Sequence, residues 1–386
     1  LGYVGSKGSG FKFAYFKNLA TQIDTERDYA LNRYKAHQAS GLRQVKWAQL
    51  VGVGANTVIK DADVTGSDKG GSHSVEKTTM NGKQGFYKGN IDVVPNPDVM
   101  YGKDFAANIY KGTALEGMDS NALQNAYNVP DYAGMFDPKS IPKASSSAAV
   151  NKLVQEGGAT VDVKLRLANR DVATSRVSEL LNSGVIAHAE LAYRKRGKNL
   201  EMGSLMEAAK GKQQDKLQFG AQAGGKNAVS WNDPKLQQSL SRLQLMDALT
   251  GQVDRNMSNF FINTDDNGNV TQLTGIDNDM AFGKRRDNID FQFNYPGISA
   301  FVDAELARRI IALKPQELVW LLDDLLDPDE LAALITRLKK LQAFLLDLQT
   351  KKKLLEPNQW NAATAQGMFD EGSSYYANLR NKRKDG

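Results

Sequence analysis

Residues 236–277 contain the pattern that most restricts how this chain can fold. Apolar positions in residues 236–249 recur at helical spacing, and the polar segment Asp-Arg-Asn-Met-Ser-Asn follows at 254–259. Two short apolar runs then flank a turn rich in Asn, Asp and Gly within residues 260–276. This order predicts a helix, a polar loop and a β-hairpin, with the carboxylate of Asp277 directly after the second strand.

The periodicity of the rest of the chain changes from strand-like to helix-like. Alternating apolar residues and glycine turns predict strands in residues 45–60, 85–89 and 185–193, and a long hairpin loop is expected in residues 61–81. From residue 300 onward the apolar positions follow a helical period, and five leucines in residues 331–345 form a stripe. We interpret this stripe as core packing, with a coiled coil as the alternative. The order predicts an α+β fold with two lobes, the first β-rich and the second helical.

Three segments are expected in chain order. Residues 1–40 form a flexible lead-in and an N-terminal helical extension. Residues 41–210 form the β-rich N-lobe, and residues 211–386 form the helical C-lobe that contains the polar loop. Residues 95–150 hold several prolines and interrupt the N-lobe as an insertion.

Composition excludes several classes of site. The 386-residue chain has no cysteine, which excludes disulfides, thiol catalysis and cysteine–zinc sites, and its three histidines are far apart in the sequence. Its formal net charge of +5, from 49 Lys and Arg against 44 Asp and Glu, suits anionic ligands but is too small to indicate a nucleic-acid partner. No apolar run approaches the ~18 residues that a membrane-spanning helix needs, and no signal peptide is visible.

The polar loop and the hairpin could bring oxygen-bearing side chains together. Asp254 and Asn259 share one loop, and the hairpin returns Asp277 to it. Mg²⁺ prefers carboxylate, amide and phosphate oxygens, and phosphoryl transfer requires an aligned hydroxyl and neutralised phosphate charge. These side chains therefore predict a phosphotransfer site that uses ATP and Mg²⁺. The alternative is an ordinary loop and hairpin, since Asp and Asn are common in turns.

The sequence Asp254-Arg-Asn-x-x-Asn259, followed by a hairpin and Gly-Ile-Asp277-Asn-Asp, resembles the catalytic loop and metal-binding aspartate of the protein-kinase-like superfamily. It is most similar to the atypical branch, which includes phosphoinositide 3- and 4-kinases and HipA-like kinases. The layout also resembles kinase-like effectors that bacteria inject into host cells. The chain departs from phosphoinositide kinases at Asn256, where those enzymes usually have His.

This resemblance implies a bilobal protein-kinase-like fold and specific roles for residues of the motif. Asp254 would orient or deprotonate the acceptor hydroxyl. Asn259 and Asp277 would bind Mg²⁺, and Asp279 would assist them.

The resemblance also implies an ATP cradle in the N-lobe. Gly52 and Gly54 would let backbone N–H groups approach the phosphates, with a plain hairpin turn as the alternative. Lys88 would contact the α- and β-phosphates, with Lys164 as the competing lysine. Glu179 would hold that lysine from the following helix, and a solvated glutamate on the helix face is the alternative.

Two further residues, Met206 and Glu207, would lie in the hinge between the lobes and contact adenine through backbone groups. The expected function is a kinase that transfers the γ-phosphate of ATP to a protein hydroxyl, as a secreted virulence effector in a host cytosol. A host protein would be the substrate, and a host activator a further partner. The alternatives are a phosphoinositide kinase, an enzyme that transfers AMP, and a non-catalytic scaffold that binds host proteins.

Overall fold

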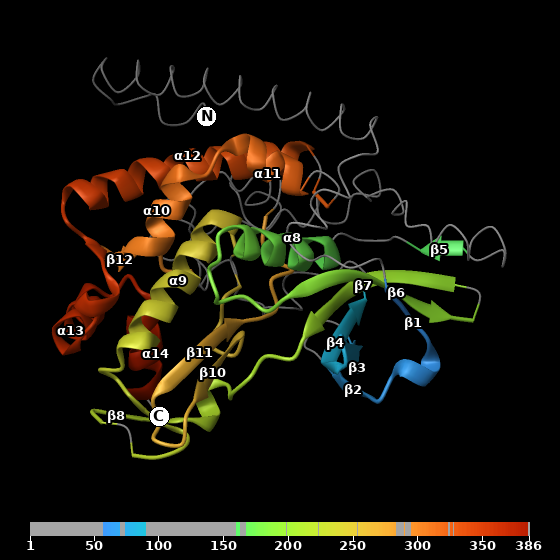
Figure 1. Cartoon of the computed structure of the whole chain (residues 1–386), viewed down its shortest axis with the longest axis horizontal. Coiled ribbons are helices and arrows are strands. Elements are labelled where there is room, and N and C mark those ends of the chain that lie inside the picture. The colour runs from blue at the N-terminus through green and yellow to red at the C-terminus, as the bar shows by residue number, and fades with distance from the viewer. Residues whose placement is uncertain are drawn as a thin grey trace, which may run out of the picture.

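The computed structural model describes residues 57–69, 74–89, 160–162, 167–197, 199–222, 224–252, 254–282, 289, 295–322, 325–326 and 328–384. Strands dominate the first part of the described chain and helices the last, which confirms the predicted α+β class (Figure 1). The predicted N-terminal helix, the insertion at 95–150, the glycines Gly52 and Gly54, and Lys164 lie outside the described residues. In the part of the chain that is described, no helix has the length and apolarity to cross a bilayer.

A seven-stranded sheet holds every described strand that precedes residue 208. Its strands are β1 (Thr57–Ile59), β2 (Gly66–Lys69), β3 (Ser74–Met80), β4 (Lys83–Gly89), β5 (Thr160–Asp162), β6 (Ala189–Arg196) and β7 (Asn199–Glu207). The order is β1-β6-β7-β4-β3-β2, and β5 also pairs with β7. Strands β2 to β4 and the pair β6–β7 run antiparallel, as do β4 and β7. The pairing of β4 with β7 puts Lys88 opposite Ser204 in the interior of the sheet.

The prediction of a long loop in residues 61–81 is wrong, because β2 and β3 lie within this segment. The turn between β3 and β4 shows why a hairpin forms there. Asn81 and Gly82 both adopt positive φ angles, 51° and 75°. Asn-Gly is the pair that tolerates this conformation best, and it matches the twist of the flanking strands. The hairpin then contributes Met80 and Tyr87 to a small core that includes Ile59, Ala192 and Leu205.

The helices form most of the remaining structure. They are α8 (Leu167–Leu180), α9 (Pro234–Thr250), α10 (Ala304–Ala312), α11 (Pro315–Leu322), α12 (Pro328–Thr350), α13 (Ala362–Glu371) and α14 (Tyr375–Lys384). Three two-stranded sheets accompany them: β8 (Gln218–Gly220) with β9 (Ala228–Ser230), β10 (Phe260–Thr264) with β11 (Val270–Gly275), and β12 (Val302–Asp303) with β13 (Leu354–Leu355). In Figure 1 the large sheet lies on one side of the molecule, and α9 to α14 lie on the other.

Helix α9 leads into the polar loop, as the sequence predicts. Asp233 caps its N-terminus by accepting a hydrogen bond from Leu236 N at 2.9 Å, and Pro234 occupies the first turn. The same carboxylate accepts from Val270 N at 2.9 Å, which fixes the helix to β11. Gly251 ends the helix in the left-handed region with φ 70°. The predicted helix and hairpin are therefore both confirmed.

Two other helices show where the apolar surface is buried. The leucine stripe of α12 is fully inside the main core, since Leu331, Leu334, Leu338, Leu341 and Leu345 are at most 1% exposed, which confirms core packing. Helix α8 lies over β6 and β7 and contacts α11 on its other side (Figure 1). Because it is covered from both sides, most of its polar side chains, although not Glu179, are buried and must find partners inside the protein.

Candidate functional site

Lys88 of β4 meets two carboxylates from the segment that follows β11. Its Nζ forms ion pairs with Asp277 Oδ1 and with Asp279 Oδ2, the latter at 2.7 Å. The side chains of Lys88 and Asp279 are 14% and 7% exposed, whereas that of Asp277 is 39% exposed. The cluster is thus closed on one side and open to solvent at Asp277, which is where a ligand could reach it.

A third carboxylate, Asp171 of α8, lies at the closed side of this cluster. Its Oδ1 accepts from Asn278 N at 2.7 Å, and its Oδ2 accepts from Ser204 Oγ at 3.2 Å. Burial raises the pKa of Asp171 to about 7, against the opposing charge of Lys88. Burial lowers the pKa of Lys88, but the charges of Asp277, Asp279 and Asp171 outweigh it and raise that pKa well above its usual value.

The backbone at Asp277 has an unusual conformation that the neighbouring residues hold. Its φ of 57° lies in the left-handed region, where a side chain other than glycine costs about 1 kcal/mol or more. Gln252 is buried and donates through Nε2 to Asp277 O at 2.8 Å. Its Oε1 accepts from Asp254 N at 3.2 Å. One glutamine therefore bridges the polar loop and the carboxylate that follows the hairpin.

Arg255 makes a second bridge between the same two segments. Its Nη1 donates to Asn259 O at 2.8 Å and to Ile276 O at 2.5 Å, and its Nη2 donates to Asn278 Oδ1 at 2.6 Å. The guanidinium is fully buried against Asp247 of α9, whose carboxylate lies 2.8 Å from Nε. A buried arginine needs this compensation, because breaking such a pair would leave an unpaired charge inside the protein.

Asn259 has a defined orientation within the loop. Its Nδ2 donates to Asp254 O at 2.8 Å, which directs the carboxamide oxygen away from that carbonyl. The backbone of Asn259 also accepts from Ile276 N at 2.9 Å, so the loop is fastened to the end of the hairpin. Hydrogen bonds thus link the backbone of Asp254 and Asn259 to the segment that carries Asp277, and Asp277 pairs with Lys88.

The oxygen atoms of Asp277 and Asn259 suit Mg²⁺ better than a metal that is held by protein ligands alone. Among the described residues no group of three or more His, Cys, Asp or Glu has metal-binding geometry. Mg²⁺ usually binds one or two carboxylates and completes its octahedron with water and substrate phosphates. The exposed carboxylate of Asp277 and the amide oxygen of Asn259 fit that pattern.

Glu179 is not placed at Lys88. It pairs with His188 Nδ1, and His188 Nε2 lies 3.1 Å from Glu190 Oε1. The hydrogen bonds to Glu179 and Glu190 raise the pKa of His188 to about 10. The acid of α8 that influences Lys88 is Asp171, which precedes Glu179 by about two helical turns, or ~12 Å along the axis.

Met206 and Glu207 are the last two residues of β7, directly before residues 208–210, which have no regular secondary structure. Strand β7 pairs with β4 on one side and β6 on the other. Met206 is 9% exposed, and the N–H of Glu207 donates to His188 O at 2.9 Å. That N–H is therefore used within the protein, and the adenine contact stays a prediction for the other backbone groups.

Sequence reasoning missed Gln252 and Asp171 as parts of the site. Gln252 lies two residues before Asp254, and a glutamine side chain is neither charged nor a usual proton donor or acceptor in catalysis. The sequence does hold one signal for Asp171. The helix around it has apolar residues on more than one face, so a carboxylate there is expected to be buried and to need a partner.

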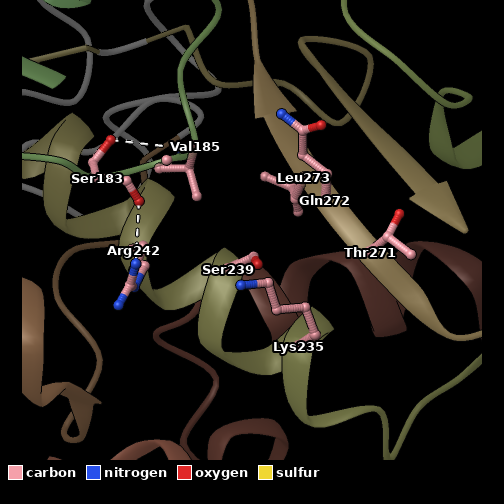
Figure 2. A pocket seen from close by; sticks show the side chains of 9 residues that line it. Ser183, Val185, Lys235, Ser239, Arg242, Thr271, Gln272 and Leu273 are labelled. Carbon is pink, nitrogen blue, oxygen red and sulfur yellow. Dashed lines mark hydrogen bonds between the residues drawn. The ribbon is translucent and has the colours of Figure 1, made fainter. Parts of the chain in front are cut away.

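A pocket of about 200 Å³ lies elsewhere, between α9, β11 and residues 183–185 (Figure 2). Arg242 lines this pocket, where it donates to Ser183 O at 3.4 Å and pairs with Asp303 at 3.0 Å. The residues that line the pocket include none of Lys88, Asp254 or Asp277. Because the charge of Arg242 is already balanced, we assign no ligand to this pocket.

Comparison with known proteins adds no assignment to this geometry. Neither the protein-family models nor the curated proteins include a match to the chain.

Proposed function

We propose that the protein is a phosphotransferase of protein-kinase-like, bilobal design, which uses ATP and Mg²⁺ to phosphorylate a protein hydroxyl. The observation that carries the proposal is the meeting of Lys88, from the large sheet, with Asp277, from the segment after the β10–β11 hairpin. A cation for phosphate and a carboxylate for metal are the two charges that a bound nucleotide–magnesium complex needs.

The exposure of Asp277 also supports a ligand at this cluster. Asp277 and Asp279 both pair with Lys88, but the side chain of Asp277 is 39% exposed whereas that of Asp279 is 7% exposed. The carboxylate of Asp277 is therefore the one that a divalent cation arriving with a nucleotide could bind.

Each residue then has a role in the proposed reaction. Lys88 would bind the nucleotide phosphates, and Asp277 with Asn259 would hold Mg²⁺. When bound, Mg²⁺ would supply neutralisation of the charge on the phosphate oxygens. Asp254 would align the acceptor hydroxyl and receive its proton, while Gln252 and Arg255 keep the loop against Asp277.

The test follows ATP labelled separately at the α- and γ-phosphates. Protein and lipid acceptors would be supplied from eukaryotic cell lysate and lipid extract, because the proposed effector would meet its substrate and its activator in a host cell. Transfer of γ-label to protein, lost in Lys88→Met and Asp277→Asn, is the expected result. Lys351→Met is the matched control, since Lys351 pairs with Asp347 on the surface at 2.6 Å.

Other outcomes of this experiment point elsewhere. Transfer of γ-label to lipid would indicate a phosphoinositide kinase, and transfer of α-label would indicate AMP transfer. If calorimetry finds no Mg²⁺-dependent ATP binding, or if label transfer is the same in Asp277→Asn as in the wild type, the proposal is wrong and the scaffold alternative gains support.

A further inference from the structure

Tyr375, at the start of α14, reaches the buried carboxylate that supports the polar loop. Its hydroxyl donates to Asp247 Oδ2 at 2.7 Å, although the two residues are 128 positions apart in the sequence. Burial and the charge of Asp247 raise the pKa of Tyr375 well above its usual value, so the hydroxyl keeps its proton and acts as a donor. A hydrogen bond to a buried carboxylate is among the stronger kinds in proteins.

The same carboxylate of Asp247 holds the arginine that bridges the two segments of the site. Its carboxylate accepts from Arg255 Nε at 2.8 Å and from Nη2 at 2.9 Å. Arg255 is 0% exposed, and all three of its guanidinium nitrogens donate to protein acceptors. The position of the loop therefore depends on partners inside the protein, among them Asp247, which Tyr375 contacts.

A second contact fixes the start of α14 on the same helix. Gln244 lies one turn before Asp247 on α9, and its Oε1 accepts from Tyr375 N at 3.1 Å. Its Nε2 donates to Ser373 O at 3.0 Å. The ring of Tyr375 packs edge-on against Tyr295, with centroids 6.2 Å apart. Backbone, ring and hydroxyl of Tyr375 are thus all constrained, which makes it a rigid support for Asp247.

We propose that Tyr375 is a positioning residue for the site, so that the docked helix α14 controls the geometry of the polar loop. The hydroxyl fixes the carboxylate of Asp247, the carboxylate fixes Arg255, and Arg255 holds Asn259 against Ile276 beside Asp277. The effect on turnover rests on the proposed phosphotransfer function, whereas the effect on loop order does not. A displacement of about 1 Å in groups that align reactants can lower a rate by about 100-fold.

The chain offers a matched control in the adjacent residue. Tyr376 is 1% exposed, and its hydroxyl donates to Trp231 O at 2.8 Å, away from the Asp247–Arg255 pair. Tyr375→Phe and Tyr376→Phe each remove one hydroxyl and its hydrogen bond, which is buried for Tyr375 and partly buried for Tyr376. Both variants should lose stability, Tyr375→Phe more than Tyr376→Phe because its bond is to a carboxylate, and only Tyr375→Phe should disturb the loop.

The experiment combines hydrogen exchange with kinetics on the full chain. In Tyr375→Phe the amides of Asn259 and Ile276, which donate to Asn256 O and Asn259 O, should exchange about tenfold faster than in Tyr376→Phe. The kcat for phosphate transfer should fall about tenfold in Tyr375→Phe only, with the KM for ATP changed less than about twofold. Equal exchange rates in the two variants would overturn the positioning role, as would equal kcat values in both. If the wild type transfers no phosphate, the proposed function fails, while the exchange rates still decide whether Tyr375 orders the loop.

Discussion

Lys88 and Asp277 form an ion pair although 189 positions separate them in the sequence. The pair joins β4 of the large sheet to the segment that leaves the β10–β11 hairpin. It therefore connects the strand-rich and helix-rich parts of the described chain. The polar loop is hydrogen-bonded to the same segment through Gln252.

Replacement of Lys88 by methionine should abolish ATP turnover, with a loss of about 100-fold or more, because the ammonium is expected to bind phosphate. The variant should also lose Mg²⁺-dependent ATP affinity by calorimetry, since three carboxylates would then repel the nucleotide. Lys351→Met serves as the control because its ion pair is exposed. Retention of full affinity in Lys88→Met would contradict a phosphate-binding role.

Asp171 and Glu179 can be distinguished by neutral substitutions of the same shape. Asp171→Asn should lower turnover about tenfold or more, because it removes a charge that acts on Lys88 and weakens the acceptor for Asn278 N. Glu179→Gln should leave turnover within about twofold, because this residue pairs with His188. Steady-state kinetics of the two purified variants checks the prediction, and the reverse order of effects would restore Glu179 as the partner of Lys88.

Gln252→Leu should destabilise the protein by about 1–3 kcal/mol, because Asp277 O and Asp254 N would lose a buried partner. Turnover should fall together with stability, since the left-handed backbone at Asp277 would no longer be held. Gln238→Leu is a matched control on α9, where the side chain donates to Asp303 Oδ2 at 2.7 Å. Chemical denaturation and kinetics would be compared, and equal losses of turnover in the two variants would argue against a bridging role.

His188 should make stability depend on pH in a defined direction. Its pKa in the folded protein is raised to about 10 by Glu179 and Glu190, so the folded state binds a proton more tightly than the unfolded chain. The stabilisation is fully present below the usual histidine pKa of about 6.5 and is lost as pH rises toward about 10.

The measurement for His188 is urea denaturation of wild type and His188→Gln at several pH values. The variant should have a free energy of unfolding lower by about 1 kcal/mol at pH 6. The expected difference is small because the side chains of His188 and Glu179 are partly exposed and solvent screens their charges. The difference should shrink between pH 7 and pH 10. A difference that is constant over this range, or that grows with pH, would contradict the assignment.

The sequence by itself determined the local elements of this protein. The helical spacing of leucines in residues 236–249 and 331–345 gave α9 and α12, and two apolar runs around a polar turn gave the β10–β11 hairpin. The common location of Asp254, Asn259 and Asp277 also follows from local order, because a hairpin returns the chain to where it began. Such features depend on residues a few positions apart.

Only the tertiary structure decided which distant residues complete the site. Glu179 and Asp171 lie on the same helix, and each residue of a helix rotates the side chain by about 100°, so periodicity alone could not choose between them. The choice depends on how α8 packs on β6 and β7, which directs Asp171 to Ser204 and Asn278 and directs Glu179 to His188. The position of Met206 and Glu207 within the sheet has a similar cause. The pairing of β7 with both β4 and β6 is set by long-range register and not by local sequence.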